Sequence, residues 1–76
     1  MKIAVIDYGM GNLFSVDQAL NRLGADVIVT SNAADFEKVD GIVLPGVGAF
    51  PDAMARLAEL ELIAPIQKTT KPLLGI

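Results

Sequence analysis

Residues 2–7 read KIAVID, an unbroken run of four apolar side chains between two charged ones. A short continuous apolar run is typical of a strand covered on both faces, as in a parallel sheet packed between helices. Three later segments have the same character: the β-branched run at 27–30, GIVL at 41–44 and LLGI at 73–76. We therefore expect four strands, and we expect the last one, at 73–76, to be buried like the others.

Helical patterns occupy the intervals between these strands. Residues 13–23 place apolar side chains at positions 13, 16, 19, 20 and 23, which form a single stripe on a helix. Asn12 precedes this segment as a candidate N-cap, and Gly24 follows it in the position that favours glycine after a helix. A helix with these boundaries is expected between the first two strands.

The second half of the chain predicts two more helices. One begins near Pro51, which suits a first helical turn, with Asp52 and Arg56 spaced to pair across one turn. A shorter helical piece is expected at 63–69, whereas the segment 35–40 reads as a polar, solvated connection. The resulting order, with short connections throughout, predicts one doubly wound α/β domain without linker or repeat.

Ligands of such sheets bind beyond the carboxyl ends of the strands, where successive crossovers diverge. Two loops at this edge are rich in glycine: residues 7–12, the first glycine loop, and residues 45–50, the second glycine loop. Glycines at the functional edge indicate close approach of the backbone to a ligand or partner. The first loop carries only the start of a dinucleotide fingerprint, because Phe14 stands where its third glycine belongs.

Composition excludes several classes of function. The 76 residues contain six Lys and Arg, nine Asp and Glu, and neither Cys nor His, so the net charge is −3. The chain alone therefore provides no thiol nucleophile, imidazole base or Cys/His zinc site. We expect no metal, no organic cofactor and no nucleic-acid partner, since no basic stripe is present. The longest uncharged stretch has eleven residues, 41–51, too few to span a bilayer, and a cytoplasmic location is expected.

Three segments carry a resemblance to a known family: IDYGMGN at 6–12, LPGVGAF at 44–50 and KPLLGI at 71–76. In this order and spacing they resemble the opening part of class I glutamine amidotransferases, and most narrowly the glutaminase subunits of imidazole glycerol phosphate synthases. The resemblance implies a flavodoxin-like, doubly wound parallel sheet of which residues 1–76 form only the first strands and helices. It also implies that this segment of the domain stops just before the nucleophile elbow.

The resemblance implies roles for both glycine loops. In that family the Pro-Gly-x-Gly turn supplies a backbone N–H to the oxyanion formed from the glutamine amide. That donor carries over to Val47, between Gly46 and Gly48, although the same residues are also compatible with a plain strand-to-helix turn. The first loop is implied to face the partner subunit, through residues Tyr8, Gly9, Met10, Gly11 and Asn12; for Asn12, helix capping explains the residue equally well.

The implied activity belongs to the intact protein. The nucleophilic Cys is expected directly after Ile76, and its His and Glu partners further on, so residues 1–76 alone are expected to be inactive. The intact protein is expected to hydrolyse glutamine to glutamate and ammonia, which a cyclase subunit consumes in histidine biosynthesis. The alternative from another class is a non-catalytic flavodoxin-like module that binds a nucleotide or phosphate through its glycine loops.

Overall fold

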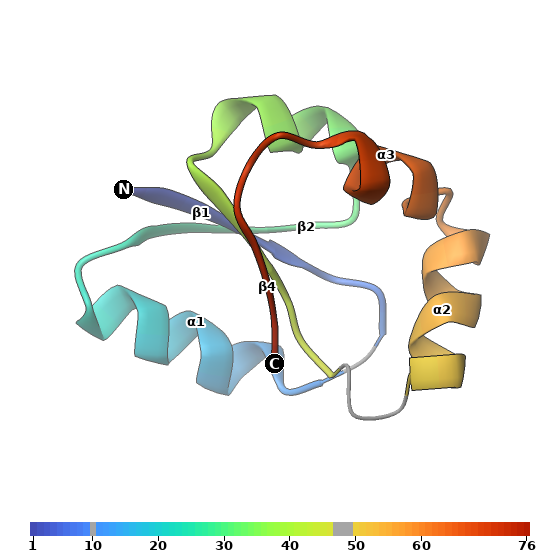
Figure 1. Cartoon of the computed structure of the whole chain (residues 1–76). Coiled ribbons are helices and arrows are strands. Elements are labelled where there is room, and N and C mark those ends of the chain that lie inside the picture. Colours follow the sequence, from blue (N-terminus) through green and yellow to red (C-terminus); the bar gives the residue numbers. More distant parts are fainter. Residues whose placement is uncertain (10, 47–49) are drawn as a thin grey trace.

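The computed structural model describes residues 1–9, 11–46 and 50–76. Within them, four strands form one parallel sheet: β1 (Lys2–Ile6), β2 (Asp26–Thr30), β3 (Gly41–Leu44) and β4 (Leu73–Gly75). The strand order is β2-β1-β3-β4 (Figure 1). In register, Ile3 pairs with both Val27 of β2 and Gly41 of β3. All four strands expected from the apolar runs are therefore present, and the parallel arrangement is confirmed.

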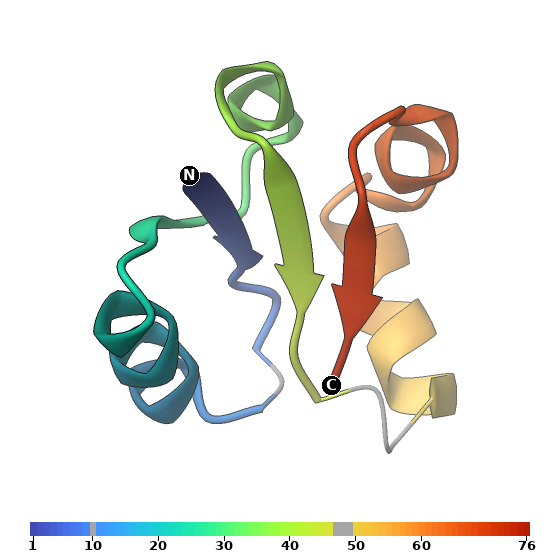
Figure 2. The same cartoon turned by 60° about the vertical axis from the view of Figure 1, so that its left-hand side comes forward.

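Helices cover both faces of this sheet. They are α1 (Leu13–Arg22), the 3-10 helix η1 (Ala33–Lys38), α2 (Phe50–Glu59) and α3 (Ile63–Lys68). In Figure 2, α1 lies apart from the group formed by η1, α2 and α3. The α/β class and the helices expected at 13–23, near 51 and at 63–69 are confirmed, with ends that differ by one or two residues.

Two apolar clusters follow from the alternation of side chains along β1. Ile3 and Val5 point toward α1 and pack with Val43 and with partly buried side chains of that helix. Ala4 and Ile6 point to the opposite face and pack in a larger cluster with η1, α2 and α3. Every residue of 3–6 is buried, which explains why the sequence shows an unbroken apolar run rather than an alternating one.

Local sequence signals set the limits of α1. The Asn12 side chain accepts a hydrogen bond from the Ser15 N–H at 3.1 Å, as an N-cap does. Gly24 has φ +86°, the left-handed conformation that ends many helices. The expected capping roles of Asn12 and Gly24 are confirmed. Leu23, expected to complete the apolar stripe, is the C-cap residue instead and is 83% exposed.

The polar connection at 35–40 is partly helical, because residues 35–38 belong to η1, whose Phe36 is buried in the larger cluster. One expectation about α2 was wrong: Asp52 is not the partner of Arg56. The guanidinium of Arg56 pairs with Glu59 at 2.5 Å and also donates to the backbone of Tyr8.

The expectation of a buried last strand was also wrong for this chain. Leu73 and Leu74 of β4 are 41% and 59% exposed, and the following Ile76 is 52% exposed. β4 lies at one edge of the sheet, and within the described residues it pairs only with β3. Because its side chains are apolar, we expect them to be covered, and the described residues do not cover them. No helix in the described part of the chain is long and apolar enough to cross a membrane.

Candidate functional site

The candidate site lies where the chain switches direction across the sheet. β1 and β3 are neighbours, but the connection after β1 leads through α1 to β2, whereas the connection after β3 leads through α2 and α3 to β4. Such switch points form the ligand crevice of open parallel sheets. The first and second glycine loops follow these two strands, whose carboxyl ends lie at the same edge of the sheet as the end of β4 (Figure 2). The topology therefore brings together all three segments that the sequence singled out.

Tyr8 joins the two loops. Its side chain is 1% exposed and packs in the larger apolar cluster, and its hydroxyl donates a hydrogen bond to the carbonyl oxygen of Pro45. Burial raises the pKa of the Tyr8 hydroxyl, so this group stays protonated and remains a donor at neutral pH. The bond explains how a buried phenol is satisfied in an otherwise apolar core.

The Pro45–Gly46 peptide is held on both of its polar sides. Its carbonyl accepts from Tyr8, and the N–H of Gly46 donates to the main-chain oxygen of Ile76 at 2.7 Å. The N–H of Ile76 in turn donates to Leu44 at 3.0 Å, so the β3–β4 ladder continues past both strands. As a result, the start of the second glycine loop lies directly beside the end of β4.

Gly11 permits close contact between the glycine loops. Its φ is +78°, and a Cβ placed there would lie 2.9 Å from both the Gly46 nitrogen and the Pro45 Cβ. Real Cβ atoms do not approach backbone so closely, so a side chain at this position would force the loops apart. The close backbone approach expected from the glycines is, at this position, an approach of one loop to the other.

Arg56 connects α2 to the first glycine loop. Its Nε donates to the carbonyl oxygen of Tyr8 at 3.1 Å, and its guanidinium would lie 3.2 Å from a Cβ added at Gly9. Sequence reasoning assigned Arg56 only to a pairing within its own helix. The contacts of Tyr8 and Arg56 span 37 and 48 residues, and no local pattern in the sequence signals them.

The structure places the predicted site residues as follows. Gly46 lies at the described start of the second loop, whereas Val47, Gly48 and Met10 lie outside the described residues. Gly9, Gly11 and Asn12 are exposed at the carboxyl edge of the sheet. Tyr8 differs from its neighbours, because the whole residue is buried and its side chain packs in the larger apolar cluster. The predicted partner surface therefore consists, among the described residues, of Gly9, Gly11 and Asn12.

The acidic segment after β2 is held by local contacts. Asp35 accepts a hydrogen bond from the Thr30 hydroxyl and pairs with Lys38 at 3.3 Å, and these contacts, the Thr30 bond first, lower the pKa of its carboxyl. Asp40 accepts from the backbone N–H of Lys2 at 2.8 Å. Among the described residues no group of three potential ligands converges on a metal position.

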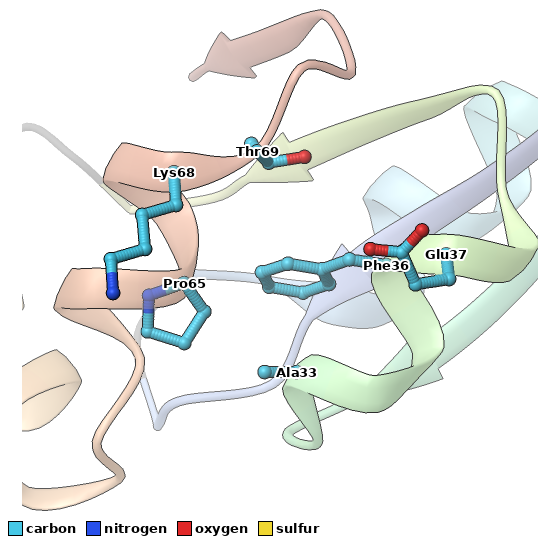
Figure 3. Close-up of a pocket in the computed structure, with 6 residues that line it drawn as sticks. All are labelled: Ala33, Phe36, Glu37, Pro65, Lys68 and Thr69. Atoms are coloured by element: carbon cyan, nitrogen blue, oxygen red, sulfur yellow. The ribbon is translucent and has the colours of Figure 1, made fainter.

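A hollow near the amino ends of the strands is a weaker candidate for the functional site. It has a volume of about 150 Å³ and lies between η1 and α3, with Phe36 at its centre and Glu37 and Lys68 at its rim (Figure 3). Sites for organic ligands usually enclose about 300–1,000 Å³. η1 leads into β3 and α3 leads toward β4, so this hollow lies near the amino ends of the strands, away from both glycine loops.

Fold and site together define the class. A parallel sheet of order β2-β1-β3-β4 with loops meeting at its switch point is flavodoxin-like, the α/β architecture of class I glutamine amidotransferases. No family model matches the chain.

Comparison with curated proteins identifies the particular relatives. The chain is 54% identical, over 77 aligned positions covering 97% of it, to imidazole glycerol phosphate synthase subunit HisH of Bacillus cereus (strain B4264). The subunits HisH of Bacillus thuringiensis (strain Al Hakam) and Bacillus anthracis (strain A0248) match with the same identity and coverage. The chain spans 37% of the length of each of these relatives. The resemblance found in the sequence is thus confirmed: over this span the chain is homologous to HisH.

Proposed function

We propose that these residues belong to the glutaminase subunit of an imidazole glycerol phosphate synthase. The intact subunit hydrolyses glutamine to glutamate and ammonia, and a cyclase subunit consumes the ammonia in histidine biosynthesis. The identity of 54% to several HisH subunits supports this assignment. We place the reaction in the cytoplasm, and we assign to residues 1–76 one wall of the active site within a single larger domain.

One hydrogen bond supports the proposed reaction mechanism. The hydrogen bond from the Gly46 N–H to Ile76 sets the second glycine loop against the end of β4. In the proposed enzyme the nucleophilic Cys follows Ile76, so the loop and the nucleophile would share one edge of the sheet. Attack of a thiolate on the glutamine carboxamide puts negative charge on its oxygen, and a fixed backbone N–H from Val47 would stabilise that charge.

The remaining steps need groups outside these residues. The tetrahedral intermediate collapses as its C–N bond breaks, a protonated His supplies the proton that leaves with ammonia, and water then hydrolyses the thioester. The part assigned to this chain is therefore electrostatic and positional. It holds an oxyanion donor, and its exposed Gly9, Gly11 and Asn12 are assigned to the surface that meets the cyclase subunit.

The alternative function, a nucleotide- or phosphate-binding module, has weaker support. Phosphate loops use consecutive backbone N–H groups that point at the anion. In the second glycine loop the first of these groups, the Gly46 N–H, is already bonded to Ile76.

The proposal is tested with the intact subunit in complex with its cyclase. We expect glutamine-dependent release of glutamate, measured by a coupled assay, and a loss of turnover of about 10²- to 10³-fold in Val47→Pro, which lacks the donor N–H. Val47→Ala is the matched control, because it keeps the N–H and should retain turnover close to wild type. Absence of glutaminase activity in the wild-type complex contradicts the function, and full turnover in a folded Val47→Pro contradicts the oxyanion role.

A further inference from the structure

The polar groups of the Pro45–Gly46 peptide have partners on two different segments. Tyr8 of the first glycine loop binds the carbonyl, and Ile76 at the end of β4 binds the N–H. Because a peptide unit is planar, fixing both groups fixes the orientation of the whole plane. The orientation of the next N–H along the chain then depends only on the φ and ψ angles of Gly46, whose φ is +80°.

We propose that Tyr8 is a positioning residue for the glutaminase reaction, acting through its hydroxyl on the Pro45–Gly46 peptide and thereby on the backbone donor that follows. The inference rests on the proposed function. It assigns to Tyr8 a role inside the subunit, in place of the contact with the cyclase that the sequence resemblance implied for this residue.

Tyr8 has the rigidity that such a role requires. Its ring is buried in the larger apolar cluster, which also contains Ile6 and Leu44, so the phenol cannot move without disturbing the core. Its backbone carbonyl is held from the solvent side by Arg56 at 3.1 Å. The hydroxyl therefore occupies a fixed point, and the carbonyl of Pro45 is oriented toward it.

Loss of the hydroxyl would free one side of the peptide plane. A buried carbonyl without a partner tends to turn toward any other donor or toward water, because leaving it unpaired is unfavourable. A donor displaced by a fraction of an ångström loses much of its effect on a developing oxyanion, since that effect depends on preorganised geometry. The ground state of bound glutamine does not carry this charge, so binding should change less than turnover.

The test compares Tyr8→Phe with wild type in the intact subunit bound to its cyclase. Phe keeps the ring in the core and removes only the hydroxyl. We expect kcat for glutamine hydrolysis to fall about 10- to 100-fold with little change in KM. Thr30→Val is the matched control, because it removes another side-chain hydroxyl, which donates to Asp35 and accepts from the Asn32 N–H and does not contact the second glycine loop; its kcat should stay at the wild-type level.

A double-mutant cycle separates positioning from a general structural effect. If Tyr8 acts through the donor at Val47, then adding Tyr8→Phe to Val47→Pro should cause no further loss of turnover. Wild-type kcat in Tyr8→Phe, or full losses from both changes in the double variant, overturns the role of Tyr8. Activity in wild type and its loss in Val47→Pro would leave the proposed function standing in that case.

A second variant tests the proposal if Tyr8→Phe does not fold. Arg56→Gln removes the support of the Tyr8 carbonyl from the exposed side of the site, where substitution disturbs no core packing. We expect a smaller fall in kcat with the same unchanged KM. Wild-type kcat in a folded Arg56→Gln, where Tyr8→Phe gives no folded protein, overturns the proposal.

Discussion

Two glycines in left-handed conformation differ in what surrounds them. Gly11 has φ +78°, and a Cβ added there would lie 2.9 Å from the Gly46 nitrogen and 3.1 Å from the Pro45 carbonyl carbon. Gly24 has φ +86°, and a Cβ added there would have nothing within 4 Å. Gly11 is therefore required both for its left-handed backbone and for lack of space, whereas Gly24 is required for its left-handed backbone alone. Substituting alanine at each position separates the cost of the backbone conformation from the cost of the steric contact.

We expect Gly11→Ala to destabilise the intact subunit more than Gly24→Ala. The left-handed conformation costs an alanine about 1–2 kcal/mol, which both variants share. Gly11→Ala adds the cost of overpacking against backbone, for a total of about 3 kcal/mol. Free energies of unfolding from urea titration measure the difference. Equal destabilisation by the two substitutions would show that the glycine loops do not pack as closely as the structure has them.

At the scale of elements, α1 is the helix whose limits depend most on single residues. No residue of α1 is fully buried, so packing alone holds it weakly, and its N-terminus relies on the bond between the Asn12 side chain and the Ser15 N–H. Asn12 is also assigned to the surface that faces the cyclase. Capping needs only a side-chain oxygen at this position, whereas a partner contact depends on the whole Asn side chain, so substitutions can separate the two roles.

We expect Asn12→Ala to lower the free energy of unfolding of the subunit by about 1 kcal/mol, and Asn12→Ser to restore most of it, because Ser also caps. Thermal and urea denaturation of the free subunit measure this effect. Titration with the cyclase then tests the second role: weaker binding by the stable Asn12→Ser variant supports a partner contact, and unchanged binding argues against it. Equal destabilisation by Ala and Ser would contradict capping as the structural role.

The elements that sequence reasoning predicted are those governed by local rules. The runs of apolar residues predicted all four strands, and Asn12 and Gly24 predicted the limits of α1. The 3-10 helix η1 was missed because it buries only Phe36, and one buried residue in six leaves no periodic stripe. For the site, the sequence predicted two glycine loops at the carboxyl edge of the sheet, but it gave no sign that Tyr8 joins them or that Arg56 of α2 binds the first loop. Those contacts join residues 37 and 48 positions apart and depend on the completed sheet.

At the scale of the whole molecule, three of the large apolar side chains that are exposed, Leu73, Leu74 and Ile76, lie in β4 or directly after it. The exposed Leu74 and Ile76 line an apolar hollow of about 230 Å³ together with Val43 and the near side of α1. A free strand edge next to exposed apolar side chains favours association with other chains. The chain spans only 37% of its relatives, and we infer that the rest of such a protein covers this region.

We predict that a peptide of residues 1–76 does not melt cooperatively, whereas the intact subunit does. The peptide has two small apolar clusters on either side of a sheet whose last strand is exposed, and the burial available to so short a chain barely offsets the conformational entropy lost on folding. Differential scanning calorimetry at several concentrations should give a broad, concentration-dependent signal for the peptide, because association through β4 contributes to its order. The intact subunit, run under the same conditions, is the control. A sharp transition of the monomeric peptide, independent of concentration, would show that the two clusters suffice and that β4 needs no further cover.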